Sequence, residues 1–208
     1  MKQYPSIDYW KDGRFGEKCY GFDKLDGSNM RFEWSKKRGW YKFGSRTQMI
    51  TPKTPILGSS IKIFMDKYAQ ELEYIFLTNR QVLKGSSNFV AFCEYLGPTS
   101  FAGFHDMKEI QSGKMDVVLF DVSMHKHGLL NPEQFIELFG HLHIPEILYE
   151  GIYDEALIKS VRDGSIPTKE GLVVKGLTRK STPWMVKLKN DEWLKRVKAK
   201  GQPEEILY

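Results

Sequence analysis

Residues 24–29 have the sequence Lys-Leu-Asp-Gly-Ser-Asn (KLDGSN) and join two stretches with the apolar character of β-strands, Tyr20–Phe22 and Met30–Trp34. Gly27 permits a tight turn and a close approach of the backbone to a ligand. Lys24 stands at the end of the first stretch, where its ammonium group can face a phosphate. Because Asp-Gly is also a common dipeptide in hairpin turns, the hexapeptide alone indicates only a turn that carries a lysine.

The apolar pattern on either side of this turn predicts more strands than helices. Further strands are predicted at Val90–Leu96, Val117–Val122, Gly171–Lys175 and Trp184–Leu188. Helices are predicted at residues 61–72 behind the N-cap candidates Ser59 and Ser60, at 132–139 behind Asn131, at 154–162 and at 191–200. Strands and helices do not alternate regularly, which favours an α+β fold with antiparallel sheets over a doubly wound parallel sheet.

Composition narrows the function only broadly. The net charge of +5 at pH 7 favours a polyanionic partner such as nucleic acid, although it also fits a mildly basic soluble protein. Cys19 and Cys93 lack the spacing of metal ligands, and no apolar run is long enough to cross a bilayer. We therefore expect a cytoplasmic protein with no membrane partner. Surface or loop positions are expected for the histidines, which lack a recognisable ligand set: His105, His125, His127, His141 and His143.

Five later segments combine strand-like residues with a charged side chain: Phe43–Arg46 (FGSR), Phe92–Gly97 (FCEYLG), Leu119–Val122 (LFDV), Glu170–Lys175 (EGLVVK) and Trp184–Lys189 (WMVKLK). Any one of them could be a charged residue on a strand edge. Together with residues 24–29 they resemble, in order, the motifs of the covalent nucleotidyltransferase superfamily of DNA ligases, RNA ligases and mRNA capping enzymes. The first and fourth motifs, KxDG and EGxVVK, are the specific ones. The resemblance extends from about Phe22 to Asn190 and favours the ATP-dependent RNA ligases.

This resemblance implies a fold and a reaction. The fold is the ligase-type nucleotidyltransferase (adenylation) domain, with twisted antiparallel sheets, flanking helices and an ATP-grasp-like arrangement, here expected over residues 1–190. A short basic helix or tail is expected over residues 191–208, with no oligonucleotide-binding barrel. The implied reaction has three steps: a lysine takes AMP from ATP, AMP passes to a 5′-phosphate end, and a 3′-hydroxyl displaces it to seal the strand.

Lys24 matches the nucleophile of this reaction. A free lysine has a pKa of roughly 10.4, so its amine must be made easier to deprotonate before it can attack. Lys187 and Lys189, two residues apart on a strand, point to one face and can both repel that ammonium and neutralise the α-phosphate. The alternative for this pair is a solvated strand edge. By resemblance, Glu170 is the carboxylate expected to bind Mg²⁺ or Mn²⁺.

The remaining site residues are implied by the resemblance. Phe120 is expected to stack on adenine, although a buried core phenylalanine is an equal alternative, and Asp121 is expected to face the other way on the strand. The other expected contacts with the nucleotide or its metal are Asp23 beside the adenine edge, Arg46 on ribose or phosphate, Glu94 on ribose or metal, and Lys175 on phosphate.

The residue type at position 29 distinguishes RNA ligases from DNA ligases. Many RNA ligases carry asparagine two residues after the glycine of the first motif, whereas DNA ligases usually have arginine there. The resemblance therefore gives Asn29 a role in the sealing steps and RNA ends, 5′-phosphate and 3′-hydroxyl, as substrates. A minimal ATP-dependent DNA ligase and an inactive nucleotide- or RNA-binding module are the alternatives. The segment Asp191–Lys200 is either a solvated terminal helix or a basic surface for nucleic acid. Without a barrel domain, substrate binding is expected to depend on this segment or on a protein partner.

Overall fold

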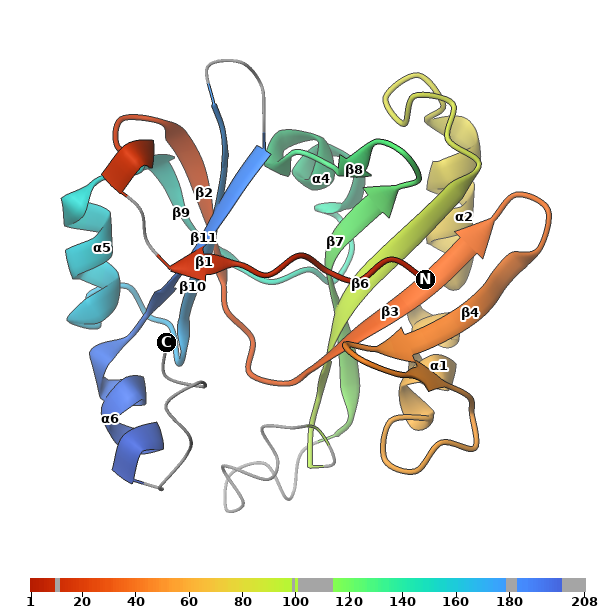
Figure 1. The fold of residues 1–208 in the computed structure, drawn as a ribbon, viewed down its shortest axis with the longest axis horizontal. Helices are drawn as coiled ribbons and strands as arrows, with labels where there is room; N and C mark the ends of the chain where they lie inside the picture. Colours follow the sequence, from red (N-terminus) through yellow and green to blue (C-terminus); the bar gives the residue numbers. More distant parts are fainter. Residues whose placement is uncertain (10–11, 99, 101–113, 179–182, 200–208) are drawn as a thin grey trace. The chain divides into compact units, whose positions relative to one another are not determined.

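The chain is organised as two compact units in a computed structural model that describes residues 1–9, 12–98, 100, 114–178 and 183–199. Unit 1 comprises Met1–Tyr4 and Asp26–Ile144, and unit 2 comprises Pro5–Leu25 and Pro145–Tyr208. Each unit is built on a single β-sheet (Figure 1). The chain crosses from unit 2 to unit 1 immediately after Lys24 and Leu25, within the KLDGSN segment.

Unit 1 contains a six-stranded antiparallel sheet with the order β5-β4-β3-β6-β7-β8. Its longest strands pair over most of their length, β3 with β6 and β6 with β7. The strands are β3 (Ser28–Ser35), β4 (Gly39–Ser45), β5 (Met49–Ile50), β6 (Asn88–Leu96), β7 (Asp116–Met124) and β8 (Gly128–Leu129).

Helices cover one face of the unit 1 sheet (Figure 1). The first is a continuous helical run made of α1 (Ser59–Phe64), the π-helical segment η2 (Met65–Ala69) and α2 (Gln70–Thr78); α4 (Pro132–Phe139) follows β8. Aromatic rings join these helices to the sheet: Phe64 stacks on Phe32 at 3.8 Å between ring centroids, and Phe76 stacks on Phe89 at 4.1 Å. The helix predicted at residues 61–72 is therefore confirmed: Ile61, Phe64, Tyr68 and Leu72 are buried, whereas Met65 is exposed.

The predicted cap of this helix is wrong. The N-cap is Gly58, whose backbone is already helical at φ −62° and ψ −31°, so Ser59 and Ser60 lie inside the first turn. Their hydroxyls take other partners: Ser60 Oγ donates to the Leu57 carbonyl at 2.6 Å, and Ser59 Oγ lies 2.6 Å from the Tyr95 hydroxyl. Serine at a helix start identified the region but not the capping residue.

Unit 2 contains a five-stranded sheet with the order β1-β11-β10-β2-β9. The short strand β1 runs parallel to β11, and the other neighbours are antiparallel. The bounds are β1 (Asp8–Tyr9), η1 (Asp12–Arg14, a 3₁₀ turn), β2 (Lys18–Asp23), β9 (Ile147–Ile152), α5 (Glu155–Arg162), β10 (Gly171–Leu177), β11 (Pro183–Lys189) and α6 (Asp191–Ala199). Among the described residues, none of the helices is both long and apolar enough to cross a bilayer.

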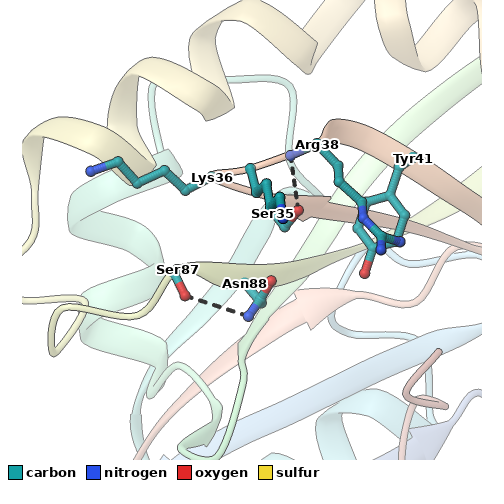
Figure 2. A pocket seen from close by; sticks show the side chains of 7 residues that line it. Ser35, Lys36, Arg38, Tyr41, Ser87 and Asn88 are labelled. Carbon is teal, nitrogen blue, oxygen red and sulfur yellow. Dashed lines mark hydrogen bonds between the residues drawn. The ribbon is translucent and has the colours of Figure 1, made fainter.

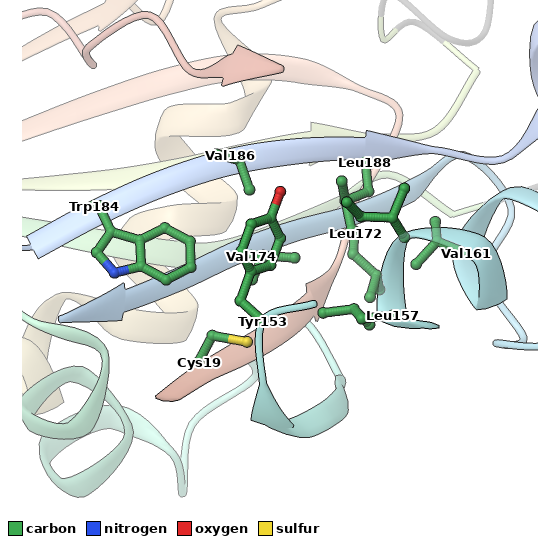
Figure 3. Close-up of a cluster of buried hydrophobic side chains, with 10 residues drawn as sticks. Cys19, Tyr153, Leu157, Val161, Leu172, Val174, Trp184, Val186 and Leu188 are labelled. Atoms are coloured by element: carbon green, nitrogen blue, oxygen red, sulfur yellow. The ribbon is translucent and has the colours of Figure 1, made fainter. Parts of the chain in front are cut away.

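One face of the unit 2 sheet is closed by α5. Leu157 and Val161 of α5 pack against alternate residues of β10 and β11, with Tyr153 and Cys19 completing the cluster (Figure 3). The strand residues in this core are Leu172, Val174, Trp184, Val186 and Leu188. Because strand side chains alternate between faces, the intervening lysines of β11 are turned to the opposite face.

All six predicted strands are present, and so are the four predicted helices within the described residues. Asn131 caps α4 by accepting from the Gln134 amide at 2.8 Å. The longer strands β4 and β9 were missed, as were the two-residue strands β1, β5 and β8. β4 follows the cationic sequence Lys36-Lys37-Arg38, and the β9 side chains are half-buried or exposed, so neither has the apolar signature of a core strand.

The N-cap of α5 can be tested by substitution. The Asp154 carboxylate accepts a hydrogen bond from the Leu157 amide at 2.8 Å, and loss of such a cap costs about 1 kcal/mol. We expect Asp154→Ala to lower the free energy of unfolding in urea by about 1 kcal/mol, and Asp154→Ser to restore most of it. An Asp154→Ala variant as stable as the wild type would show that the carboxylate contributes nothing as a cap.

Candidate functional site

Lys24 is held at the end of β2 by the first residues of β10. Its backbone amide donates to the Gly171 carbonyl at 2.8 Å, and its Nζ lies 2.7 Å from Glu170 Oε1. Gly171 has φ +146°, and a Cβ built there would lie 1.9 Å from the Leu188 carbonyl oxygen. A glycine is therefore required after Glu170, because only glycine lets β11 approach this closely.

A second lysine shares the same carboxylate oxygen. Lys189 Nζ lies 3.5 Å from Glu170 Oε1, because the β10–β11 register places Lys189 directly opposite Gly171. Glu170 is only 3% exposed. Its other oxygen, Oε2, is buried and has no hydrogen-bond partner among the described residues. One buried carboxylate thus receives two cations on one oxygen and keeps the other oxygen available for a further ligand.

Aromatic rings position the cations on this face of the sheet. Lys187 Nζ lies 4.1 Å from the centroid of the Tyr9 ring in β1, and Lys189 Nζ lies 4.2 Å from that of Trp193 in α6. Lys175 Nζ lies 4.9 Å from the Phe22 ring centroid. A cation over a ring face gains electrostatic attraction without losing its charge. These lysines are therefore ordered without being neutralised by the rings.

The electrostatic environment favours an anionic ligand. Burial is the main cause that lowers the pKa of Lys189; Lys24 and Lys187 lower it further, whereas Glu170 opposes the shift. The cations of this part of unit 2 outnumber its acids, which are Asp23, Glu146 and Glu170; the cations are Lys24, Lys169, Lys175, Lys187 and Lys189. Such an excess of partly desolvated positive charge is compensated most simply by phosphate.

Asp23 is fixed by a residue that the sequence did not reveal. Its backbone amide donates to the Glu146 carbonyl at 2.8 Å. The Thr168 hydroxyl lies 2.7 Å from both Asp23 Oδ1 and the Gly171 carbonyl, and it accepts from the Gly171 amide at 3.0 Å. Burial raises the pKa of Asp23, and the hydrogen bond from Thr168 opposes this rise. Thr168 orders the turn before Glu170, and only its position two residues before the fourth motif could have indicated this.

In unit 1, Asn29 and Glu94 are neighbours across two strands. The β3–β6 register pairs Asn29 with Glu94 directly. Asn29 Oδ1 is buried and has no hydrogen-bond partner among the described residues. A Cβ at Gly27 would lie 2.5 Å from the Tyr95 carbonyl, so this glycine lets the KLDGSN segment run tightly along β6. The pair therefore presents an amide and a carboxylate from adjacent positions of the sheet.

Phe120 lies at a β-bulge. Residues Phe92 and Asp121 are paired, and so are Cys93 and Leu119, which leaves Phe120 as the extra residue of β7. The expectation that Asp121 faces away from Phe120 is wrong, because the bulge breaks the alternation of side chains. Tyr4 contacts both: its ring lies edge-on to Phe120 with centroids 5.0 Å apart, and its hydroxyl donates to Asp121 Oδ2 at 2.9 Å.

The aromatic side chains around the bulge form a cluster within unit 1. Tyr4 also packs edge-on against Phe92 at 5.0 Å, and Phe92 and Phe120 lie nearly parallel with centroids 6.4 Å apart. Burial, followed by the neighbouring Asp121 carboxylate, raises the pKa of Tyr4, so its hydroxyl remains a hydrogen-bond donor. Phe120 is only partly buried. It is held in a defined orientation but is not a core residue, which favours the stacking interpretation over the core interpretation.

Arg46 is an exposed residue of the turn between β4 and β5 and makes no ion pair within the described part of the chain. The structure therefore does not join it to Phe120 or Glu94. The neighbouring cation Arg31 is structural instead: it is 3% exposed, and its Nε donates to the Ser45 carbonyl at 2.7 Å. Its guanidinium also contacts the carbonyls of Met1 and Lys2.

The predicted site residues fall into two groups. Unit 2 brings together Lys24, Asp23, Glu170, Lys175, Lys187 and Lys189, whereas Asn29, Arg46, Glu94 and Phe120 belong to unit 1. The predicted metal ligands Glu170 and Glu94 are thus in different units. Among the described residues no group of three or more His, Cys, Asp or Glu could hold a metal ion. Four of the histidines are exposed, as expected, and His105 lies outside the described residues.

A model of the RNA ligase family matches residues 17–199, which is most of the chain. The chain belongs to the RNA ligase family. The matched segment runs from just before β2 to the end of α6 and so includes the whole unit 2 group. A comparison with curated proteins gave no match.

Solved structures of the Naegleria gruberi RNA ligase share the fold. The enzyme with PPi gives a TM-score of 0.70 at 16% identity, covering 96% of this chain and 58% of that one. A variant with AMP and Mn gives 0.63 at 17% identity, covering 95% and 58%. An apo variant gives 0.60 at 19% identity, covering 95% and 60%. The α+β nucleotidyltransferase fold is thereby confirmed, and this chain spans 58–60% of those chains.

The shared carboxylate can be tested by titration. Since Glu170 raises the pKa of Lys189, we expect Glu170→Gln to lower that pKa further, because the amide keeps the shape and removes the negative charge. The measurement is an NMR titration of lysine side chains labelled at Cε. Glu150→Gln removes an exposed carboxylate of β9 and is the control, which should leave Lys189 unchanged. A Lys189 pKa that stays constant or rises in Glu170→Gln would contradict the assignment.

Proposed function

We propose that this RNA ligase family member is an ATP-dependent RNA ligase that joins 5′-phosphate and 3′-hydroxyl ends through a lysyl-AMP formed on Lys24. The observation that carries the proposal is the placement of the Lys24 amine, 2.7 Å from the buried Glu170 carboxylate and within a group of cations. A lysine nucleophile needs both a proton acceptor and compensation for phosphate charge. This arrangement supplies both.

In the first step the Lys24 amine attacks the α-phosphorus of ATP. A nitrogen–phosphorus bond forms, and the bond from phosphorus to pyrophosphate breaks. Before attack the ammonium must lose a proton, and Glu170 Oε1, its hydrogen-bond partner, is placed to receive it. The positive charges of Lys187 and Lys189 favour the neutral amine and stabilise negative charge that develops on the phosphate.

Residues of the chain also fit a divalent metal ion. Glu170 Oε2 is a buried acceptor with no partner among the described residues, and Mg²⁺ in nucleotide sites often takes only one or two carboxylates together with phosphate oxygens and water. We propose Glu170 as the main ligand and Glu94 as a further ligand of Mg²⁺ or Mn²⁺. A bound metal would neutralise phosphate charge. Naegleria gruberi RNA ligase variants have been solved with ATP or AMP and Mn, which supports this proposal.

The other predicted residues receive roles in nucleotide binding and sealing. Phe120, ordered by Tyr4 at the bulge, stacks on the base, and Asp23 lies at its edge. Lys175 and Arg46 contact phosphate or ribose. Asn29, with its unpartnered buried oxygen, acts at the strand break.

We also propose a domain organisation and a cellular location for the protein. Residues 1–190 form the nucleotidyltransferase domain, and substrate binding is aided either by the basic side chains of the segment 191–208 or by a protein partner. Within α6, Lys195, Arg196 and Lys198 are exposed while Trp193 is buried. This charge distribution suits contact with a nucleic-acid backbone. A cytoplasmic location fits the two free, buried cysteines.

The nucleophile assignment has a direct test. After incubation with radiolabelled ATP and a divalent metal, the protein should carry label through denaturing electrophoresis. Lys24→Ala should carry none, because Lys24 Nζ lies within hydrogen-bond distance of Glu170 Oε1 at 2.7 Å, whereas Lys189 Nζ lies 3.5 Å away. Lys24→Arg should also fail, since guanidinium does not deprotonate. Lys18→Ala, at the exposed start of β2, is the matched control and should retain labelling.

Labelling of Lys24→Ala at the wild-type level would refute the assignment of Lys24 as the nucleophile. An unlabelled wild-type protein would favour a binding module instead. If labelling succeeds, nicked duplexes with ribose or deoxyribose on the 3′ side of the break decide between an RNA and a DNA ligase.

Lys189 should affect the rate of adenylylation more than the affinity for ATP. We expect Lys189→Ala to reduce the rate by about 10²–10³-fold, because its charge is needed as the transition state forms. Since burial lowers the pKa of Lys189, wild-type activity should decline at alkaline pH as this charge is lost. In Lys189→Arg that decline should move to higher pH, because arginine stays protonated.

Single-turnover labelling measured across pH provides the rates, and equilibrium binding provides the affinities. Lys159→Ala, an exposed substitution on α5, is the control. Equal losses in rate and affinity, or the same alkaline decline in Lys189→Arg, would count against this role.

A further inference from the structure

A pocket of about 540 Å³ lies on unit 1 at the connection between β3 and β4. It is lined by Ser35, Lys36, Lys37, Arg38, Tyr41, Ser87 and Asn88, which we call the hairpin pocket (Figure 2). Three consecutive cations occupy the connection itself, and a tyrosine from β4 stands beside them. None of these residues belongs to the nucleotidyltransferase motifs.

The backbone of the hairpin pocket is fixed by hydrogen bonds. The Lys36 amide donates to the Ser87 carbonyl at 2.9 Å, and the Arg38 amide donates to the Ser35 carbonyl at 3.1 Å. The Arg38 amide also donates to Ser35 Oγ at 3.2 Å; Figure 2 draws this hydrogen bond as a dashed line. The connection is therefore tied both to its own strand and to the segment before β6, so the three cations project from an ordered turn.

The hairpin pocket carries three cations and has one acid, Glu33, close by. Lys36, Lys37 and Arg38 are exposed, and within the described part of the chain none of them forms an ion pair. The nearby Glu33 carboxylate instead accepts from the Tyr41 hydroxyl at 2.7 Å. Arg38 lies 5.2 Å from the Tyr41 ring centroid. The pocket thus offers cations with free charge next to an aromatic ring.

Residues around the three cations add hydrogen-bond donors and a further positive charge. Ser87 and Asn88 add a hydroxyl and an amide, 3.4 Å apart, which can donate to phosphate oxygens. The His125 amide donates to the Asn88 carbonyl at 3.0 Å, so the β7–β8 turn, with exposed Lys126, adjoins the pocket. Cations, neutral donors and an aromatic ring in one place are the features that bind a polynucleotide strand.

We propose that the hairpin pocket binds the sugar-phosphate backbone of the RNA strand at a distance from the break. The identity of the strand as RNA rests on the proposed function. Asn29, proposed to act at the break, is at the start of β3, and Lys36 follows its end. Seven residues of strand span about 23 Å, which corresponds to roughly seven nucleotides at about 3.4 Å each. The pocket therefore contacts the body of the substrate and not its reacting end.

The test compares two triple variants with equal loss of charge. Lys36→Gln/Lys37→Gln/Arg38→Gln removes the three cations of the pocket, and Lys53→Gln/Lys62→Gln/Lys159→Gln removes three exposed lysines from separate elements. Circular dichroism establishes that both variants are folded. Binding of a single-stranded RNA of about 24 nucleotides is measured without ATP between roughly 50 and 200 mM salt, the range over which phosphate contacts change affinity most clearly.

The pocket variant should bind this RNA at least about tenfold more weakly at the lower salt concentration, and the slope of log affinity against log salt should become shallower by about 2, since each phosphate contact on a single strand contributes about 0.7. The control variant should retain most of the affinity and slope. With an RNA of about five nucleotides, too short to span β3, sealing by the pocket variant and by the wild type should be equally inefficient.

Unchanged affinity and slope in the pocket variant would overturn the proposal, and so would equal losses in both variants, which would show an effect of net charge alone. Loss of binding to polyglutamate with RNA binding intact would point to an acidic protein partner and would also overturn it. Labelling of Lys24 with ATP is measured in parallel and should be normal in the pocket variant. If even the wild type is not labelled, the proposed ligase activity fails while the RNA-binding comparison still decides the pocket.

Discussion

The candidate site depends on one buried carboxylate oxygen that is shared by two ammonium groups. Glu170 Oε1 lies 2.7 Å from Lys24 and 3.5 Å from Lys189, which connects the end of β2 with the facing ends of β10 and β11. A buried charge that loses its partner is costly. Removing any one of these three side chains is therefore expected to destabilise the folded chain. Two ammonium groups on one carboxylate make the local charge positive, which favours an anionic ligand.

Backbone geometry makes this sharing possible. Gly171 allows β11 to approach β10 where a side chain would collide with the Leu188 carbonyl, and the register then places Lys189 opposite it. The alternation of side chains along β11 orients the lysines. Trp184, Val186 and Leu188 pack in the core under α5, so Lys187 and Lys189 lie on the other face of the sheet. The same strand therefore contributes one face to the core and the other face to the candidate site.

Much of the architecture and of the unit 2 group could be predicted from sequence. Core strands such as β6 and β7 carry continuous apolar residues, and Lys187 and Lys189 are placed on one face by their spacing alone. The Phe120 bulge could not be predicted, because an extra residue in a strand has no signature in an apolar run. The role of Thr168 was missed because the sequence does not distinguish a threonine that orders a turn from any other threonine in a turn. The cap at Gly58 was missed because serine is common both at and just after helix starts.

The bulge in β7 makes strand length as important as residue identity. The register on either side of Phe120 is correct only because one residue has no partner in β6. Removing Leu119 would restore regular pairing, but it would turn the Phe120 ring and the Asp121 carboxylate to opposite faces, and Tyr4 could then contact only one of them. Substitutions in β7 can be absorbed locally by repacking, whereas a one-residue deletion would separate the aromatic surface from the hydrogen bond that orients it.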